Sequence, residues 1–168
     1  MELWDIYDAQ RRPTGRTHAR GAPMRRGEYH INVFVWIFNS AGELLLTKRS
    51  PEKESYPNLW ETTGGAVLAG ETSRQAIVRE LREETGLCAA PEEFVFLDSV
   101  RGKTWFSDTY ALRRDAPLSQ IVLQPGETCG ARWVTRAAFE RMIAAGEVAQ
   151  PDVQRFYTLA YFFNELLK

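Results

Sequence analysis

The chain has little that would mark a membrane, secreted or thiolate-metal protein. It has two cysteines, Cys88 and Cys129, and their spacing fits neither a zinc site nor a redox pair. Its longest uncharged apolar run, residues 31–38, is far shorter than the roughly 20 residues that span a bilayer. Residues 1–12 contain acids and no apolar segment, so no secretory signal is expected. We therefore expect a cytoplasmic protein.

The chain also lacks an excess of either charge. Lys and Arg number 21 against 22 Asp and Glu, for a formal net charge of -1. No overall basic field argues for a nucleic-acid partner. The hydrophobic content of 44% and the length of 168 residues fit one globular domain. Because no repeat or linker divides the chain, we expect a single domain over residues 1–168, with a short N-terminal extension over residues 1–28.

Alternating or β-branched segments predict a sheet, with loops at Gly- and Pro-rich stretches. The arginine-rich residues 9–27 are predicted to be loop, and residues 119–124 are a weaker strand prediction. The stronger strand predictions are residues 2–8, 30–38, 43–49, 59–65, 93–100, 104–113 and 130–134. Together with the helices below, this mixed order predicts an α+β fold, an αβα sandwich around a mixed β-sheet.

Three helices are predicted from caps and from apolar periodicity. Thr72 and Gln75 form a capping-box pattern for a helix that ends near Gly86. Thr135 caps a short second helix that ends at Gly146. Asp152 is predicted to cap an amphipathic last helix, whose apolar stripe is Phe156, Ala160, Phe163 and Leu167.

The helix after Thr72 carries a crowd of carboxylates. At 100° per residue, Glu80, Glu83 and Glu84 share an arc of about 100° that adjoins the apolar positions Ile77 and Leu81. Carboxylates at the edge of a buried stripe need positive partners. A divalent hard cation would serve all three, whereas neighbouring arginines would serve some of them; a fully solvated acidic face is the other interpretation. The arginines in reach are Arg74, Arg79 and Arg82.

The spacing of "GGAVLAGETSRQAIVRELREETGL" resembles the Nudix box of the MutT-related hydrolases, G-x5-E-x7-R-E-U-x-E-E-x-G-U, where U is aliphatic. Every constrained position of that box is filled. These positions are Gly65, Glu71, Arg79, Glu80, Leu81, Glu83, Glu84, Gly86 and Leu87.

The resemblance implies a Nudix-type fold and a hydrolase that cleaves a diphosphate linkage in a nucleoside diphosphate-X or a related small molecule, with Mg²⁺ or Mn²⁺. It implies that Glu80, Glu83 and Glu84 are catalytic residues and metal ligands, and that the Gly65 carbonyl adds a ligand. Glu127 is our candidate for a further acidic ligand from outside the box. The structural positions of the box would be Glu71, Arg79 and Gly86, with Leu81 and Leu87 in the core. Dimers are common in the family, but the sequence itself does not show one.

The first half of the chain also resembles isopentenyl-diphosphate isomerase, which shares the Nudix fold. That family places its catalytic cysteine immediately before the box glycine, where this chain has Gly64. It has glutamates on a later strand where this chain offers Asp108, and a metal-binding histidine where His30 stands. Isomerisation is therefore kept as the alternative function, and hydrolysis is favoured. A non-catalytic module that binds a nucleotide or a protein is the further alternative.

Basic residues outside the box are candidates for phosphate contact. Lys48 and Arg49 end a predicted strand at the expected mouth of the cleft. Six arginines lie within residues 11–26, where a solvated loop is the simpler interpretation for most of them. The sequence leaves open the group joined to the diphosphate, the number of metal ions and the identity of the general base.

Overall fold

The strand β3 (His30–Phe38) is the centre of the sheet, and its β-branched and aromatic side chains suit burial on both faces. The computed structural model describes residues 2–159. Strand β8 (Trp105–Arg113) runs parallel to β3 over its whole length, from His30↔Trp105 to Phe38↔Arg113. The other pairings in this sheet are antiparallel, so the sheet is mixed.

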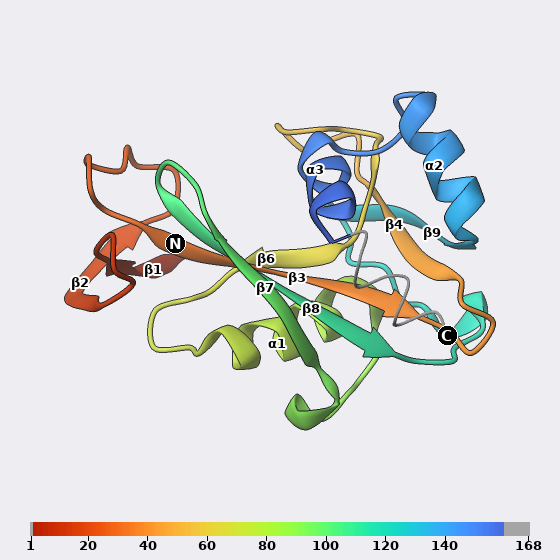
Figure 1. Cartoon of the computed structure of the whole chain (residues 1–168), viewed down its shortest axis with the longest axis horizontal. Helices are drawn as coiled ribbons and strands as arrows, with labels where there is room; N and C mark the ends of the chain where they lie inside the picture. The colour runs from red at the N-terminus through yellow and green to blue at the C-terminus, as the bar shows by residue number, and fades with distance from the viewer. Residues whose placement is uncertain (1, 160–168) are drawn as a thin grey trace.

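On the side away from β8, β3 pairs with two strands that diverge from each other (Figure 1). Strand β6 pairs with the first half of β3, whereas β4 meets β3 at Phe38↔Leu44 and then pairs with β9 and β5. On the opposite side, β7 pairs with β8 and forms an edge. The remaining strands of the sheet are β4 (Leu44–Arg49), β5 (Trp60–Glu61), β6 (Thr63–Ala66), β7 (Val95–Arg101) and β9 (Thr128–Val134).

Helices cover both faces of the sheet, as Figure 1 shows. On one face Val33 and Val35 of β3 pack with Ile77 of α1 (Ser73–Thr85). On the other face Trp36 packs with Phe139 of α2 and Phe156 of α3. These helices are α2 (Arg136–Ala144) and α3 (Gln150–Thr158). The two cores follow from the two-residue alternation of β3, and the predicted αβα sandwich is confirmed.

The ends of α1 follow the predicted caps. The Thr72 hydroxyl accepts a hydrogen bond from the Gln75 N–H (3.2 Å), and the Gln75 side chain accepts one from the Thr72 N–H (2.8 Å). At the other end Gly86 has the left-handed conformation (φ 71°) that closes a helix, and its N–H donates to the Arg82 carbonyl. Thr135 caps α2 as predicted. Residues next to the acidic helix in the sequence therefore determine where it begins and ends.

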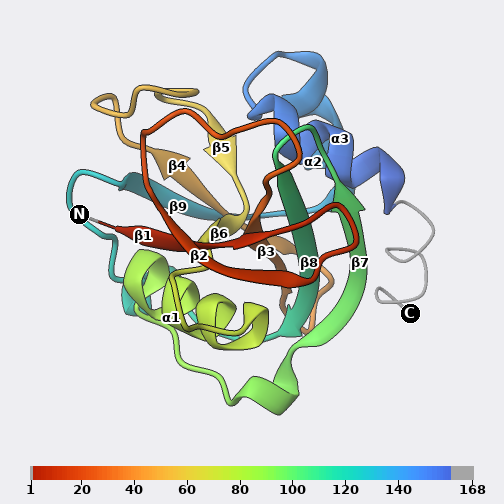
Figure 2. The same cartoon turned by 90° about the vertical axis from the view of Figure 1, so that its left-hand side faces the viewer.

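The arginine-rich segment differs from the prediction of a loop, because Pro13–Ala19 forms strand β2. It pairs with β1 (Leu3–Tyr7) in a separate two-stranded sheet, which lies against the end of the main sheet where β3 begins (Figures 1 and 2). Pattern alone missed this strand, since it is polar, and arginines within and beside it form ion pairs with acids outside the strand. These are Arg11–Asp108, Arg16–Glu28 and Arg20–Glu2.

Two further predictions were wrong. Residues 119–124 form no strand; a short 3₁₀ turn, Leu118–Gln120, lies there instead. Asp152 does not cap α3, which begins after Ala149. The Asp152 carboxylate is instead buried and accepts hydrogen bonds from the N–H and the hydroxyl of Thr62.

Of the predicted apolar stripe on the last helix, Phe156 is buried. Ala160, Phe163 and Leu167 lie outside the described residues. Within residues 2–159 no helix is long and apolar enough to cross a membrane.

His30 joins the N-terminal hairpin to the main sheet. Its ring stacks on Trp4 with a centroid separation of 4.2 Å and an interplanar angle of 14°. Its Nδ1 is buried and has no hydrogen-bond partner among the described residues. Burial, and secondarily the nearby His18, lowers the pKa of His30 to about 4. Because this pKa lies below that of the unfolded chain, the neutral imidazole contributes stability above about pH 6.5, which is lost as the pH falls toward 4.

We predict that His30→Phe, which keeps the aromatic contact with Trp4, makes the fold less sensitive to acid. Between pH 7 and pH 4 the variant should lose less unfolding free energy than the unmodified protein, by at most about 3 kcal/mol. Urea unfolding at several pH values measures this difference. The control variant His18→Gln should retain most of the pH dependence, and equal slopes for His30→Phe and the unmodified protein would contradict the assignment.

Candidate active site

A cavity of about 420 Å³ lies where β4 and β6 diverge, enclosed by the edge of α1, the start of α3 and the loop after β4. The carboxylates predicted from the helix wheel, Glu80, Glu83 and Glu84, all line it. They differ strongly in exposure: Glu84 is buried, Glu80 nearly so, and the Glu83 side chain is 42% exposed. The acidic stripe therefore lies at the edge of the core, as the wheel predicted.

Arg79 ties the acidic helix to the loop that precedes it. Its guanidinium donates to both carboxylate oxygens of Glu71 (2.8 and 2.9 Å) and to the Ala66 carbonyl (3.0 Å). It also donates to Glu80 (2.7 Å) and Glu83 (3.0 Å). Glu71 in turn accepts from the Leu68 N–H, so one guanidinium holds the β6–α1 loop against α1.

Two glycines of β6 allow close approaches, Gly65 to α1 and Gly64 to β3. A Cβ at Gly65 would overlap the Glu80 carboxylate, and a Cβ at Gly64 would overlap the Val33 carbonyl oxygen and the Phe34 ring. The Gly64 N–H donates to Glu84 at 3.3 Å. The absence of a side chain at Gly64 and Gly65 therefore brings the β6 backbone within reach of the helix carboxylates.

The carboxylates in the cavity raise one another's pKa values. Burial, followed by the charges of Glu61 and Glu80, raises the pKa of Glu84 well above its usual range. Burial also raises the pKa of Glu80, although Arg79 opposes this. Burial and the neighbouring Asp152 raise the pKa of Glu61 to about 7, against the influence of Arg49. Within residues 2–159 no arginine or lysine is paired with Glu84.

The comparisons with known proteins agree with this geometry. The family model for the NUDIX domain matches residues 28–154. The chain belongs to the Nudix hydrolase family. An uncharacterized Nudix hydrolase from Listeria monocytogenes is 38% identical over 154 residues, which cover 88% of each chain. A crystal structure from Deinococcus radiodurans has a TM-score of 0.76 at 30% identity, covering 92% of this chain and 96% of that one. The predictions of the Nudix fold and of a diphosphate-cleaving hydrolase are confirmed at the level of the family.

The similarity to isopentenyl-diphosphate isomerase is weaker than the similarity to Nudix hydrolases. An isopentenyl-diphosphate isomerase from Escherichia coli is 31% identical over 94 residues, covering 55% of this chain and 52% of that protein. The structure adds a steric argument, because Gly64 has no room for the side chain of a cysteine without a shift of β3. Asp108 is engaged elsewhere, by Arg11 and Ser99. These features favour hydrolysis over isomerisation.

The donor set of this Nudix box suits a divalent cation. It offers carboxylate oxygens and a backbone carbonyl, the ligands that Mg²⁺ and Mn²⁺ prefer, and the buried Glu84 carboxylate stands beside other acids without a cationic partner among the described residues. As the side chains stand, no three acidic, histidine or cysteine side chains of residues 2–159 are arranged to hold a metal ion. Arg79 holds Glu80 and Glu83, so a bound cation would take over part of the neutralisation that Arg79 provides.

The remaining predicted residues fall into two groups. Arg49 and Glu127 line the cavity, where Arg49 donates to Glu61 (2.6 Å) and Glu127 is paired with Lys53. Lys48 instead directs its ammonium over the Trp60 ring, 5.9 Å from its centroid. His30 stacks on Trp4.

Sequence reasoning missed several polar residues of the cavity, among them four that bear on its charge. These are Lys53, Glu61, Asp152 and Arg155. Glu61 gave a usable signal, since it is an acid within the strand-like segment that leads to the box glycines. Asp152 was noticed but assigned to a helix cap. Lys53 and Arg155 reach the cavity through the loop after β4 and the docking of α3, which no local pattern specifies.

We predict that Gly65→Ala displaces the Glu80 carboxylate while the fold is retained, because the overlapping atoms are at the end of a flexible side chain. The affinity for Mn²⁺ should fall about 10- to 100-fold, the usual cost of losing a feature that orients a metal ligand. The Mn²⁺-dependent rise in Tm and the Mn²⁺ concentration for half-maximal hydrolysis both measure this. Gly130→Ala is the control, since a Cβ there makes ordinary contacts with Lys48 and Trp60. Unchanged Mn²⁺ affinity in Gly65→Ala would show that Glu80 does not need its present position.

Proposed function

We propose that this protein is a Mg²⁺- or Mn²⁺-dependent Nudix hydrolase that cleaves the diphosphate of a nucleoside diphosphate-X or a related small molecule. The observation that carries the proposal is the cluster of buried carboxylates at a complete Nudix box, where Glu84 lies beside Glu61 and Glu80. Such a cluster costs stability unless a cation neutralises it. We therefore expect the carboxylate cluster to have a function, which is to bind a cation.

In this proposal Glu80, Glu83 and Glu84 hold the cation, with the Gly65 carbonyl and Glu127 as further ligands. A divalent cation at such a site supplies charge neutralisation for the phosphate oxygens and lowers the pKa of bound water. The protein orients the substrate, and one carboxylate takes the proton of the attacking water. Water adds to one phosphorus atom and the P–O–P bridge breaks, which yields two phosphate products. Arg49 and Lys53 at the cavity wall are placed to attract the anionic substrate.

We further propose that residues 1–168 act as one domain, to which the β1–β2 hairpin belongs as an extension. Glu2, Trp4 and Arg20 of this hairpin line the same cavity as the Nudix box, which supports a shared role.

A cytoplasmic location is part of the proposal too. It is supported by the free and exposed thiols of Cys88 and Cys129.

We predict opposite effects of Glu84→Gln on stability and activity. Without metal the variant should be more stable, with Tm higher by about 2–6 °C, because it removes a buried charge whose pKa is raised by its neighbours. Its metal-dependent hydrolysis of diphosphates should fall at least about 100-fold. Thermal unfolding with and without Mg²⁺, together with phosphate release, measures both effects.

Glu83→Gln should lose activity to a similar degree with little change in Tm, since that side chain is 42% exposed. Glu92→Gln, on the exposed 3₁₀ turn after α1, is the matched control for a Glu-to-Gln change. Metal-independent hydrolysis that survives both substitutions would refute the proposed function. Turnover of isopentenyl diphosphate in a label-exchange assay would favour the isomerase instead.

A further inference from the structure

The β1–β2 hairpin brings one arginine to the cavity of the Nudix box. Six arginines lie within residues 11–26, all of which the structure describes, and of these only Arg20 lines that cavity. Arg20 directly follows β2, and Glu2 directly precedes β1. The Arg20 N–H donates to the Glu2 carbonyl (3.0 Å), and its guanidinium donates to the Glu2 carboxylate (2.7 Å). The pair therefore closes the open end of the hairpin at the cavity wall.

The hairpin is fixed against the loop that leads into the acidic helix. The Ala69 N–H donates to the Leu3 carbonyl (2.8 Å), and the Gly70 N–H donates to the Asp5 carboxylate (2.8 Å). Both donors belong to the loop between β6 and α1. Figure 2 shows the hairpin in front of β6 and above α1. The same loop therefore positions both Arg20 and the carboxylates of α1.

Arg20 lies within electrostatic reach of two candidate metal ligands. Its hydrogen bond with Glu2 raises its pKa, burial opposes this rise, and the charges of Glu127 and Glu80 add to it. The pKa of Glu80, which burial raises most, is raised further by the charge of Glu2. An anionic group held by a cation on these carboxylates would therefore be attracted to Arg20.

The other cations of the cavity are more firmly engaged than Arg20. Their side chains are 13–23% exposed, whereas the side chain of Arg20 is 54% exposed and that of its partner Glu2 is 47% exposed. Within residues 2–159 the Arg20 guanidinium donates to no side chain except Glu2. The other cations are Arg49, Lys53, Arg79 and Arg155.

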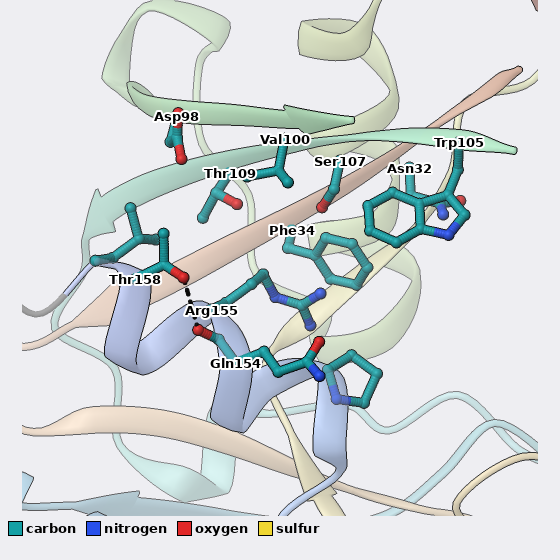
Figure 3. Close-up of a pocket in the computed structure, with 12 residues that line it drawn as sticks. Asn32, Phe34, Asp98, Val100, Trp105, Ser107, Thr109, Gln154, Arg155 and Thr158 are labelled. Atoms are coloured by element: carbon teal, nitrogen blue, oxygen red, sulfur yellow. Dashed lines mark hydrogen bonds between the residues drawn. The ribbon is translucent and has the colours of Figure 1, made fainter. Parts of the chain in front are cut away.

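Arg155 is an example of such a fixed cation. It donates to the buried Asp152 carboxylate (2.9 Å), and its guanidinium carbon lies 3.4 Å from the centroid of the Phe34 ring. Figure 3 shows it extending from α3 toward Phe34, beside a neighbouring cavity of about 330 Å³ between α3 and the strands β3, β7 and β8. Breaking such a pair is costly, because the acid would be left buried without a counter-charge.

The ion pair of Arg20 with Glu2 is much easier to exchange. A pair between half-exposed side chains contributes little stability, because water can solvate both charges when they separate. A phosphate offers several oxygens that match the fork of the guanidinium, and its hydrogen bonds to arginine are strong because both partners are charged. A phosphate in the cavity would therefore compete effectively with Glu2 for Arg20.

We propose that Arg20 is a substrate-binding residue, which exchanges its ion pair with Glu2 for a phosphate of the diphosphate substrate. The inference rests on the proposed hydrolase function and adds to it a residue from outside the Nudix box and the main sheet. Arg20 binds the phosphate both before and during the reaction, so that it lowers KM and has little effect on kcat. Glu2 competes with the substrate for Arg20 and thereby weakens substrate binding.

The test measures the binding of methylenediphosphonate, a diphosphate mimic with a P–C–P bridge that resists hydrolysis, by calorimetry in the presence of Mg²⁺. Arg20→Gln should weaken binding about 10-fold or more, the effect of one lost hydrogen bond between charged groups. It should raise KM for a hydrolysed diphosphate by a similar factor and change kcat less than about twofold.

Arg16→Gln is the matched control for Arg20→Gln. The Arg16 side chain belongs to the same hairpin, is also 54% exposed and is also paired with an acid, Glu28, but it does not line the cavity. Its substitution should leave KM and the affinity for the mimic unchanged.

Glu2→Gln should have the opposite effect to Arg20→Gln. It releases Arg20, so the mimic should bind about 2- to 5-fold more tightly, which corresponds to one exposed ion pair. In the Arg20→Gln background the same substitution should leave the affinity nearly unchanged, because no guanidinium remains to be released. An equal gain in both backgrounds would show that Glu2 acts on the substrate by its charge alone, and would overturn the proposed exchange.

A purely structural ion pair would give a different result. Arg20→Gln and Glu2→Gln would then both lower Tm and leave KM and the affinity for the mimic unchanged, which would refute the role of Arg20 although the hydrolase stands. If no diphosphate is hydrolysed but the mimic binds with the expected order of affinities, the Arg20 site stands and the hydrolase proposal fails. Absence of binding to the unmodified protein, with Mg²⁺ and a millimolar concentration of the mimic, also refutes the Arg20 site.

Discussion

The buried carboxylate of Glu84 is the constraint on which the site depends. It lies against the backbone of β6 and faces Glu61 and Glu80, so that burial and like charges both oppose its ionisation. The surrounding structure reduces this cost with cations that are each fixed by other contacts. Arg79 neutralises Glu80 and Glu83 while holding Glu71, and Arg49 neutralises Glu61. The arginines that hold the Nudix box in position therefore also reduce the repulsion among its carboxylates.

Much of the fold was predictable where local chemistry decides it. The capping box at Thr72, the left-handed Gly86 and the alternating pattern of β3 specify their elements within a few residues. The position of the acidic stripe followed from helix periodicity alone, because α1 is a regular helix with one apolar face. The complete spacing from Gly65 to Leu87 then identified the family.

The remainder depends on contacts between distant segments. Strand β2 is polar and lies in an arginine-rich segment, and it pairs with β1 while Arg11 and Arg16 form ion pairs with Asp108 and Glu28. Asp152 has the sequence appearance of a helix cap, but the docking of α3 buries it against Thr62. Arg155 reaches the site by the same docking. No periodicity in the sequence encodes which helix turn will meet which strand, so the cavity between α3 and the strands β3, β7 and β8 could not be predicted.

The parallel pairing of β3 with β8 also bears on how this protein folds. The register joins His30 to Trp105, 75 positions later (105 − 30), and β6 and α1 lie within the intervening chain. Closing so long a loop costs entropy before the pairing contributes stability, which slows folding relative to helical or hairpin-rich domains. The cavity between α3 and the strands β3, β7 and β8 is complete only once this pairing has formed. Chains that stop short of this step expose the apolar residues of β3, so that folding rate and resistance to aggregation are linked to the strand that organises the site.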